Sequence, residues 1–515
     1  MALLQLCTLF WLLGSISAIP SSQGDLGLIF NTTNGLVIGH HAPNVSGVIE
    51  ALGIAYAQPP IGNLRFAAPQ KYEGSSSYEA SNWLIGLVSI PVIHDHDKLD
   101  MLIIGPSSDC PLTASPPTDY PGFVPQAQRV IQNFASGAGF TIGNTNSPFY
   151  NGQYLANAQD VVVVTLNYRL NIFGFPGAPD LSEQNLGLRD QRLAVEWVRD
   201  NIAAFGGDPS KITIFGQSSG GVAVDWWSYA YQEDPIVHGY ISHSGSAFSF
   251  PLNQPNVTLK NWYNVTAQLG CGSTGETLEC MRQADWVAIK NATAKVRPSS
   301  GGSPLRSIPA FYPVADNVTV FTDYLDRAQR GDFSKLPYLL GNNDYEQSYY
   351  KIPAYAAGTN ATEAQGDQFL LESFTCPNAF EAQNRKEHGV PVWLFRYFGD
   401  WDNTRLYPDS EFSPGGSQAY HGSDLQMIFG ASEDVSGLPT TEEQREVTGL
   451  MQKAWAAFAE DPAKGLESVM GWPKFDEEKE SLILLARDNS VEAEIVLPSE
   501  YDAECDGVVL AGLPD

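Results

Sequence analysis

The alternation of apolar and polar residues between positions 160 and 217 predicts a strand, a helix and a second strand. Residues 160–168 form an almost unbroken β-branched run, which is typical of a strand buried on both faces. Residues 190–204 carry apolar side chains at helical spacing, and a Gly-Gly-Asp-Pro sequence ends this helix. Residues 212–215 are again a short apolar run. This order of elements predicts a βαβ unit and therefore a parallel sheet.

The C-terminal half continues this pattern. Further strands are expected at residues 337–340, 392–398 and 482–486. A helix is expected over residues 442–460, with Thr440 and Glu443 at capping-box spacing before it. One face of this helix is apolar and consists of Val447, Leu450, Met451, Ala454, Trp455 and Phe458. With short strands and turns over residues 19–80, we expect an α/β fold of one domain over residues 19–515, in which helices flank a mostly parallel sheet beside a small N-terminal β region.

The N-terminus has the pattern of a secretory signal peptide. Residues 1–18 carry no charged side chain, residues 3–13 are apolar, and residues 14–18 are small and cleavable. The alternative is a strand of the mature protein. No other run is long and apolar enough to cross a bilayer, so we expect a secreted, extracellular protein without stable membrane insertion.

Composition limits the partners and marks surface sites. The 515 residues carry a formal net charge of -29, which disfavours nucleic acid and anionic membranes as partners. In a secreted chain, Asn-x-Ser/Thr sequons are candidate glycan acceptors on surface loops. They occur at Asn31, Asn44, Asn256, Asn264, Asn291, Asn317 and Asn360.

Five cysteines remain after the one in the signal peptide is removed. Cys271 and Cys280 are close enough in sequence to close a small loop, and we pair them. Cys376 with Cys505 is the second expected disulfide. Cys110 is left over, which is unusual in an oxidising compartment.

A candidate nucleophile lies directly after the strand at residues 212–215. Gly216-Gln-Ser-Ser-Gly220 fits the pattern G-x-S-x-G, in which a serine occupies a sharp strand-to-helix turn with its hydroxyl exposed. The N–H group of Ser219 then begins a helix and points where an oxyanion would form. We interpret Ser218 as the nucleophile; the alternative is an ordinary Gly/Ser loop.

The serine needs a base, and the base needs an orienting acid. His421 lies in a loop flanked by small residues and is the candidate base, although a single histidine is often structural. Asp344 and Glu346 follow a predicted parallel strand, where sites commonly form, and either is the candidate acid. Either carboxylate could instead be a solvated surface charge.

Segments spread over most of the chain resemble the type-B carboxylesterase/lipase family, which includes the cholinesterases and has the α/β-hydrolase fold. These segments are residues 53–57 with Pro60, Gly62, Arg65 and Phe66, residues 167–170, 173–175, 185–191, 205–221 and 244–246, Gly341-x-Asn343-x-x-Glu346, residues 421–425, and Phe429-Gly430. Asp225-Trp-Trp and residues 454–458 are most similar to secreted fungal members.

The resemblance implies a role for each matched position. It makes Ser218 the nucleophile, His421 the base and Glu346 the acid. Glu346 is preferred to Asp344 because it fills the acidic position of the motif. The implied oxyanion-hole donors are the backbone N–H groups of Ala138, Gly139 and Ser219. Ser244 is expected next to the triad, and the pairing of Cys271 with Cys280 is also supported.

Residues 81–136 depart from the family pattern. The family has a cysteine-closed loop before residue 110 and then an apolar strand that ends in His-Gly-Gly-Gly or Tyr-Gly-Gly-Gly. Here Cys110 lacks a partner, the strand position reads residues 128–134, and the glycine run is residues 136–139. We hypothesise that part of this segment comes from an error in the gene model, which would disturb the oxyanion loop and the sheet.

No metal or organic cofactor is expected. His94, Asp95, His96 and Asp97 could form a metal cluster, but a polar loop is the favoured interpretation. The predicted function is a secreted serine hydrolase that cleaves small-molecule or lipid carboxylic esters through an acyl-enzyme intermediate. The alternatives are a triacylglycerol lipase of the same family and a catalytically impaired or non-catalytic cholinesterase-like protein.

Overall fold

The computed structural model describes residues 28–74, 78–79, 87–93, 99–104, 139–145, 147–410 and 413–513. Several predictions lie outside these residues and stay predictions: the signal peptide at residues 1–18, the polar stretch at residues 94–97, unpaired Cys110 and the oxyanion donor Ala138.

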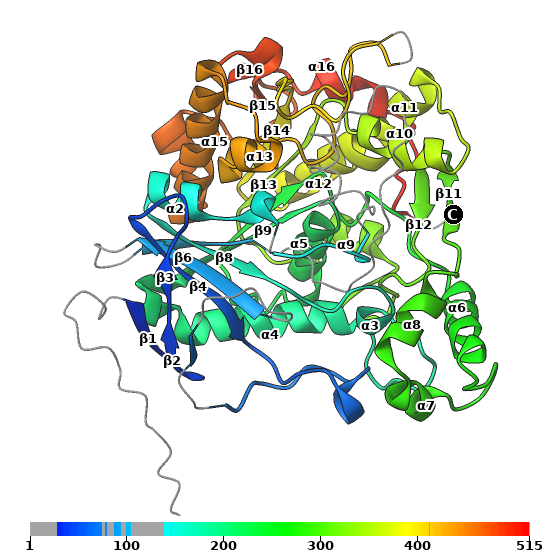
Figure 1. The fold of residues 1–515 in the computed structure, drawn as a ribbon. Helices are drawn as coiled ribbons and strands as arrows, with labels where there is room; N and C mark the ends of the chain where they lie inside the picture. The colour runs from blue at the N-terminus through cyan, green and yellow to red at the C-terminus, as the bar shows by residue number, and fades with distance from the viewer. Residues whose placement is uncertain are drawn as a thin grey trace, which may run out of the picture.

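An eleven-stranded sheet runs through the centre of the described residues (Figure 1). Its strands, in order across the sheet, are β16 (Glu494–Val496), β15 (Leu482–Leu485), β14 (Val392–Tyr397), β13 (Tyr338–Asn343), β10 (Gly239–His243), β9 (Gly207–Gln217), β7 (Leu99–Ile104), β8 (Val161–Leu166), β6 (Leu87–Ile93), β4 (Val48–Ala55) and β3 (His40–His41). All neighbouring pairs from β15 to β8 are parallel, and the strands outside them pair antiparallel. The predicted mostly parallel sheet is confirmed.

Smaller β elements accompany this sheet. The N-terminal β region contributes a three-stranded sheet of β1 (Ile29–Thr32), β2 (Gly35–Ile38) and β5 (Tyr78–Glu79). A hairpin joins β11 (Ser299–Ser303) and β12 (Arg306–Ile308).

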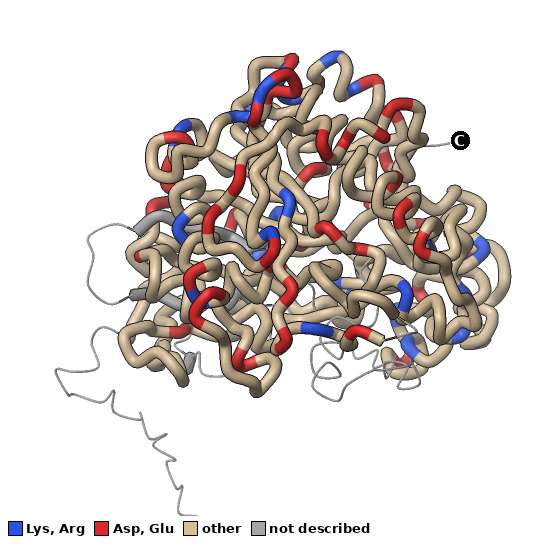
Figure 2. The backbone as a smooth tube through the Cα atoms, turned by 90° about the horizontal axis from the view of Figure 1, so that it is seen from above, with Lys and Arg blue, Asp and Glu red and all other residues tan. Residues whose placement is uncertain are grey.

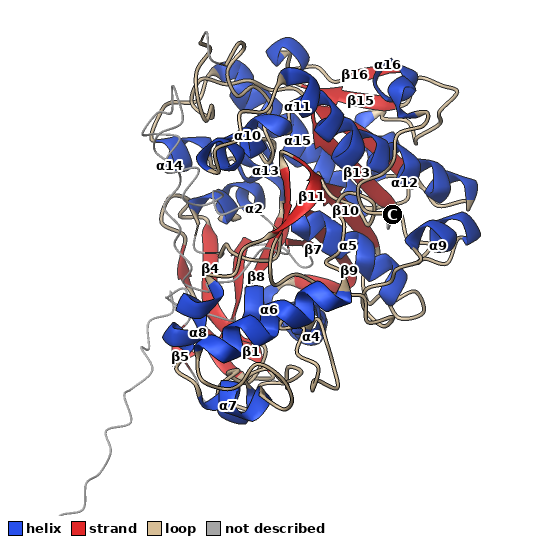
Figure 3. Cartoon of the chain, turned by 90° about the vertical axis from the view of Figure 1, so that its right-hand side faces the viewer, coloured by secondary structure: helices blue, strands red, loops and turns tan. Residues whose placement is uncertain are grey.

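Helices connect the parallel strands and cover both faces of the sheet (Figures 1 and 3). The α-helices are α2 (Gln153–Gln159), α3 (Asn171–Gly174), α4 (Leu186–Asn201), α5 (Ser219–Ala230), α6 (Pro255–Gln268), α7 (Leu278–Gln283), α8 (Trp286–Thr293), α9 (Tyr324–Arg330), α10 (Gln347–Ala356), α11 (Glu363–Leu370), α12 (Cys376–Glu387), α13 (Leu425–Phe429), α14 (Ser432–Ser436), α15 (Glu442–Glu460) and α16 (Ser499–Asp502).

The apolar core has one layer on each face of the sheet, and strand β8 shows why. Successive side chains of a strand point to opposite faces. Val162 and Val164 accordingly belong to the cluster that contains α4 and α5, whereas Val161 and Val163 belong to the cluster that contains α2, α13 and α15. A strand buried on both faces therefore has to be apolar at almost every position, as the sequence of β8 is.

Helix α15 has the predicted bounds, but its predicted cap is wrong by one residue. Thr441 is the N-cap, and its side chain accepts a hydrogen bond from the backbone N–H group of Gln444. Thr440 precedes it and donates its own N–H group to Glu433. Two adjacent threonines followed by Glu-Glu-Gln satisfy the capping pattern in either register, so only the entry of the chain into the helix decides between them.

The unusual segment at residues 81–136 contributes two strands to the main sheet. Strand β7 lies between β8 and β9 and pairs with both in parallel, and β6 pairs antiparallel with β4 and β8. Residues 128–134, where the strand before the oxyanion loop was predicted, lie outside the described residues. The sheet position next to β9 is therefore filled by residues 99–104.

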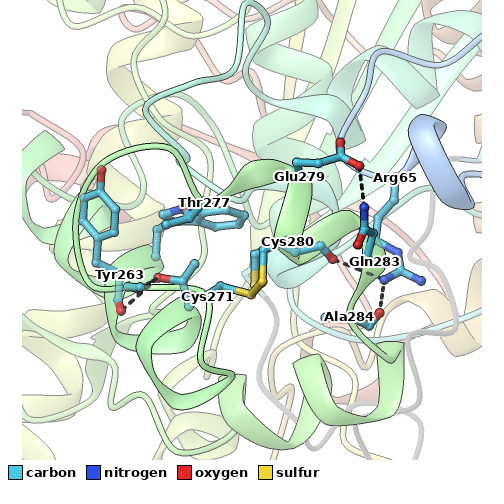
Figure 4. Close-up of a disulfide and its surroundings, with 12 residues drawn as sticks. Arg65, Tyr263, Cys271, Thr277, Glu279, Cys280, Gln283 and Ala284 are labelled. Atoms are coloured by element: carbon cyan, nitrogen blue, oxygen red, sulfur yellow. Dashed lines mark hydrogen bonds between the residues drawn. A yellow bond between two sulfur atoms is a disulfide. The ribbon is translucent and has the colours of Figure 1, made fainter.

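Two disulfides are present and match the two predicted pairings. Cys376–Cys505 joins the first residue of α12 to the C-terminal segment. Cys271–Cys280 links the loop after α6 to helix α7 (Figure 4). Beside it, Trp262 donates its indole N–H group to Thr277 and Arg65 contacts the carbonyl of Ala284, which ties this peripheral helical group to the N-terminal part of the chain.

Candidate active site

Ser218 lies in the turn that joins strand β9 to helix α5. Its backbone has φ 58° and ψ -123°, a strained combination that costs a non-glycine residue about 1–3 kcal/mol. The residues around Ser218 must be glycines because the backbone segments lie very close together. A Cβ atom on Gly216 would lie 2.1 Å from the carbonyl oxygen of Gly220. A Cβ atom on Gly245 would likewise lie 2.2 Å from the carbonyl oxygen of Ser218. The glycines thus allow the tight turn that the sequence motif predicts.

The predicted base and acid come from two loops and meet in the interior. Glu346 follows strand β13 and immediately precedes helix α10, and His421 lies in the loop before α13. His421 Nδ1 is 2.5 Å from Glu346 Oε2, and the two side chains are 1% and 0% exposed. The carboxylate therefore fixes the orientation of the imidazole and accepts a proton bonded to Nδ1.

The other oxygen of Glu346 is held as firmly. Ser244 Oγ donates to Glu346 Oε1 over 2.6 Å, and the backbone N–H group of Asn343 donates to the same oxygen over 2.7 Å. Ser244 lies just after strand β10 with φ 52°. Each carboxylate oxygen thus has its own donors, and rotation of the carboxyl group would break at least one of these bonds.

Asp344, the second acid candidate, has a different partner. Its Oδ1 atom pairs with Arg396 Nε at 2.8 Å, and its side chain is 31% exposed. Of the two candidates, the structure places only Glu346 against His421.

The outward nitrogen of His421 has two polar neighbours. Gln217 Nε2 lies 3.1 Å and the Tyr350 hydroxyl 3.2 Å from His421 Nε2. Because Nδ1 faces a carboxylate and Nε2 faces the amide N–H group of Gln217, the hydrogen-bond partners place a proton on Nδ1. The Ser218 hydroxyl is buried, and it forms no hydrogen bond of acceptable geometry within the described part of the chain.

A narrow cleft opens over Ser218. Its lining is mainly apolar and consists of Gly139, Ser218, Ser219, Phe250, Pro251, Arg306, Ile308, Pro309, Tyr312 and Tyr350. Gly139, which has φ 70°, and Ser219 therefore border the same space as the Ser218 side chain. Ala138, the third expected oxyanion donor, lies outside the described residues.

Three residues near His421 were missed in the sequence. Gln217 and Tyr350 contact its Nε2 atom, and Asn343 contacts Glu346. The position of Tyr350 could have been predicted from the sequence. It lies four residues after Glu346 at the start of a helix, and this spacing places the two side chains on one face of the helix. Among the described residues, no group of three or more His, Cys, Asp or Glu side chains is arranged to hold a metal ion.

Known proteins share the sequence pattern. Residues 123–372 and 359–499 match the carboxylesterase family. The Secreted lipase 5 of Gibberella zeae is 32% identical, over 93% of this chain and 94% of its own length. The Chlorogenic acid esterase of Aspergillus niger is 31% identical, over 95% of this chain and 97% of its own length.

Solved structures share the fold. A PNB esterase structure superimposes with a TM-score of 0.71 at 24% identity, and covers 93% of this chain and 99% of its own. The expected α/β-hydrolase fold and the resemblance stated from the sequence are both confirmed. The chain belongs to the carboxylesterase family and is a carboxylic ester hydrolase.

Proposed function

We propose that this enzyme is a secreted serine hydrolase in which Ser218 is the nucleophile, His421 the general base and Glu346 the residue that orients the base. The observation that carries this proposal is the buried 2.5 Å contact between His421 and Glu346, beside a cleft that contains Ser218 in a strained turn. A nucleophile, a base and an acid in this relation are the elements of acyl-transfer catalysis.

The reaction follows from the proton positions. His421 Nε2 is unprotonated and takes the proton of the Ser218 hydroxyl as Oγ attacks the ester carbonyl. The resulting imidazolium is stabilised by the Glu346 carboxylate. Proton transfer from Nε2 to the alkoxy oxygen releases the alcohol and leaves an acyl-enzyme, which water cleaves by the same steps.

The negative charge of the tetrahedral intermediate needs donors on the other side of the carbonyl carbon. Ser219, the first residue of helix α5, and Gly139 both line the cleft, and their backbone N–H groups suit this role. With Ala138 as a third donor, they form the proposed oxyanion hole. The positive end of the α5 dipole acts in the same direction.

Secretion is supported by the surface of the molecule. The asparagines of all seven sequons are exposed, as glycan acceptors must be, and two disulfides are present. Asp and Glu residues are spread over the described part of the backbone (Figure 2), in keeping with the formal net charge of -29. Within the described residues, no helix has the length and apolar character needed to span a bilayer. One relative carries the name Secreted lipase 5.

A triacylglycerol lipase of the same family is the second candidate, and the name of that relative favours it. A lipase is expected to gain activity when a triglyceride exceeds its solubility and forms an emulsion, whereas an esterase saturates on dissolved short-chain esters. Rates measured across the solubility limit of tributyrin separate the two.

The test of the proposed function is hydrolysis of p-nitrophenyl butyrate by the wild-type protein and the Ser218→Ala variant. We expect kcat to fall on the order of 10⁶-fold without a change in Tm, because the covalent step is lost. Wild-type protein should also become labelled at Ser218 by an organophosphonate. Activity that survives Ser218→Ala, or a folded wild-type protein without activity, would reject the proposal and favour the non-catalytic alternative.

A further inference from the structure

The Tyr350 hydroxyl occupies a position next to the reacting atoms that the proposed triad does not use. It lies 3.2 Å from His421 Nε2, and the Tyr350 ring lines the cleft together with Ser218, Ser219 and Gly139. Gln217 also reaches Nε2. Of these two donors, Tyr350 is the one whose side chain borders the cleft that a substrate would enter.

The ring of Tyr350 is held in place from several sides. Its centroid lies 4.7 Å from that of Phe369, 6.1 Å from Phe374 and 5.0 Å from the imidazole of His421. Its backbone is part of helix α10, which begins directly after Glu346. The hydroxyl is therefore fixed relative to the same element that supplies the acid, and it needs no loop closure to reach His421.

This phenol remains a hydrogen-bond donor. Burial raises the pKa of Tyr350 well above its ordinary value, and the negative charge of the Glu346 carboxylate and Tyr349 raise it further, by more than the nearby Ser218 hydroxyl lowers it. Tyr350 therefore keeps its proton over the range in which esterases work, and it cannot serve as the acid that gives a proton away.

The position of the hydroxyl suggests its target. In the proposed mechanism His421 Nε2 passes its proton to the alkoxy oxygen of the ester, so that oxygen lies about 3 Å from Nε2. The Tyr350 hydroxyl lies at a similar distance from the same nitrogen, on the cleft side. Because Tyr350 lines the cleft that the ester would enter, its hydroxyl and the alkoxy oxygen would approach the same nitrogen from the same side.

We infer that Tyr350 is a further catalytic residue that donates a hydrogen bond to the leaving-group oxygen of the ester. This inference rests on the proposed function. In the free enzyme the hydroxyl donates to His421 Nε2. When the tetrahedral intermediate collapses, the bond between carbon and the alkoxy oxygen breaks and its electron pair stays on that oxygen. The proton comes from Nε2, and Tyr350 stabilises the developing charge without losing its own proton.

The inference predicts a dependence on the leaving group. p-Nitrophenolate is a stable anion that gains little from a donor, whereas an alkoxide gains much. Tyr350→Phe should lower kcat/KM for ethyl butyrate about 10- to 100-fold, the loss expected for one hydrogen bond to a charged group. The loss for p-nitrophenyl butyrate should stay below about threefold. Both esters form the same acyl-enzyme, so a change in the ratio of their kcat/KM values arises in the steps up to and including the departure of the alcohol.

A matched control is one residue away. Tyr349→Phe removes the same hydroxyl from a neighbouring ring that lies 5.8 Å from the imidazole of His421, and it should leave the ratio of the two kcat/KM values unchanged. A role of Tyr350 in packing alone would lower the rates for both esters equally. Tyr350→Leu, which also lacks the hydroxyl, repeats the measurement if the Phe variant does not fold.

The outcomes separate this inference from the proposed function. A selective loss with ethyl butyrate in the variant without the Tyr350 hydroxyl supports the inference. An equal loss with both esters, or no loss, overturns it while the Ser218 mechanism stands. Activity that survives Ser218→Ala rejects the mechanism and the inference together.

Discussion

The described residues include two buried pairs of a histidine and a carboxylate, and the pairs differ in what surrounds the second nitrogen of each imidazole. His421 contacts Glu346 through Nδ1, and His243, at the end of strand β10, contacts Asp424 through Nδ1. Beyond the second ring, the Trp455 indole N–H group donates to His243 Nε2 over 2.8 Å. His421 Nε2 instead has Gln217 and Tyr350 as neighbours, and Tyr350 lines the cleft together with Ser218.

This difference separates a structural pair from a candidate catalytic one. The side chains of His243 and Asp424 are 0% exposed, and the His243 imidazole lies between the rings of Phe215 and Phe395 at 4.6 Å and 4.7 Å. Both nitrogens of His243 thus have partners within the core, and neither partner, Asp424 or Trp455, lines the cleft with Ser218. A carboxylate next to an imidazole does not by itself make that imidazole a base, because the base also needs a reacting group within reach of its other nitrogen.

The two pairs are physically linked. The side chain of Asn343 donates to Asp424 Oδ1 over 3.0 Å, while its backbone N–H group donates to Glu346. The end of strand β13 therefore fixes both carboxylates. Substitutions at the two acids test whether this shared support serves stability at one pair and chemistry at the other.

Among substitutions in the two pairs, Glu346→Gln should have the largest effect, a fall in kcat on the order of 10⁴-fold for p-nitrophenyl butyrate. The amide keeps the size of the side chain but removes the charge that stabilises the imidazolium. Steady-state kinetics beside a thermal melt measure it. A variant that is unstable but active per folded molecule would place Glu346 with the structural pair instead.

Asp424→Asn should affect stability rather than chemistry. It weakens the bonds from His243 and Asn343 inside the core, which should lower the free energy of unfolding by about 3 kcal/mol. Below the melting range, kcat should stay within tenfold of wild type, the small change arising through Asn343. Urea unfolding and kinetics at 20 °C provide both values. A loss of kcat comparable to that of Glu346→Gln would break the distinction between the pairs.

Trp455→Phe should have a smaller effect of the same kind. Phenylalanine keeps most of the ring packing but leaves His243 Nε2 without its donor, which costs about 1–2 kcal/mol. We expect unchanged kcat/KM for both butyrate esters. An unchanged melting temperature would show that the indole N–H group is not needed to hold His243.

The dependence of Tm on pH below pH 5 provides the test with the smallest expected effect. Burial raises the pKa of Asp424, but the His243 contact and the Asn343 hydrogen bond outweigh it, and the net pKa lies below the ordinary value of 3.8. A carboxyl group with a lowered pKa stabilises the fold above that ordinary value and loses this contribution as pH falls below it. The difference in Tm between wild type and Asp424→Asn should therefore narrow as pH falls from 5 to 3. A constant difference would contradict the lowered pKa.

Local sequence patterns were sufficient to predict much of the fold of this protein. The apolar run of β8, the periodicity of α15 and the glycines around Ser218 each encode their own conformation, because backbone sterics and one-sided burial act over a few residues. Glu346 was preferred to Asp344 through resemblance alone, since both follow the same strand. The Arg396 contact that separates them crosses from β13 to β14.

Contacts between segments that are distant in the sequence could not be predicted from the sequence. Three features depend on how separate elements pack against each other. They are the capping register of α15, the use of residues 99–104 as a central strand, and the hydrogen bond from Trp455 to His243. By itself, the sequence determined the α/β architecture, the strand–turn–helix at Ser218 and the candidates His421 and Glu346. Only the tertiary structure decided which histidine has Tyr350, a residue of the cleft, at its second nitrogen. Two imidazoles have the same chemistry and differ only in the groups that the folded chain brings to that nitrogen.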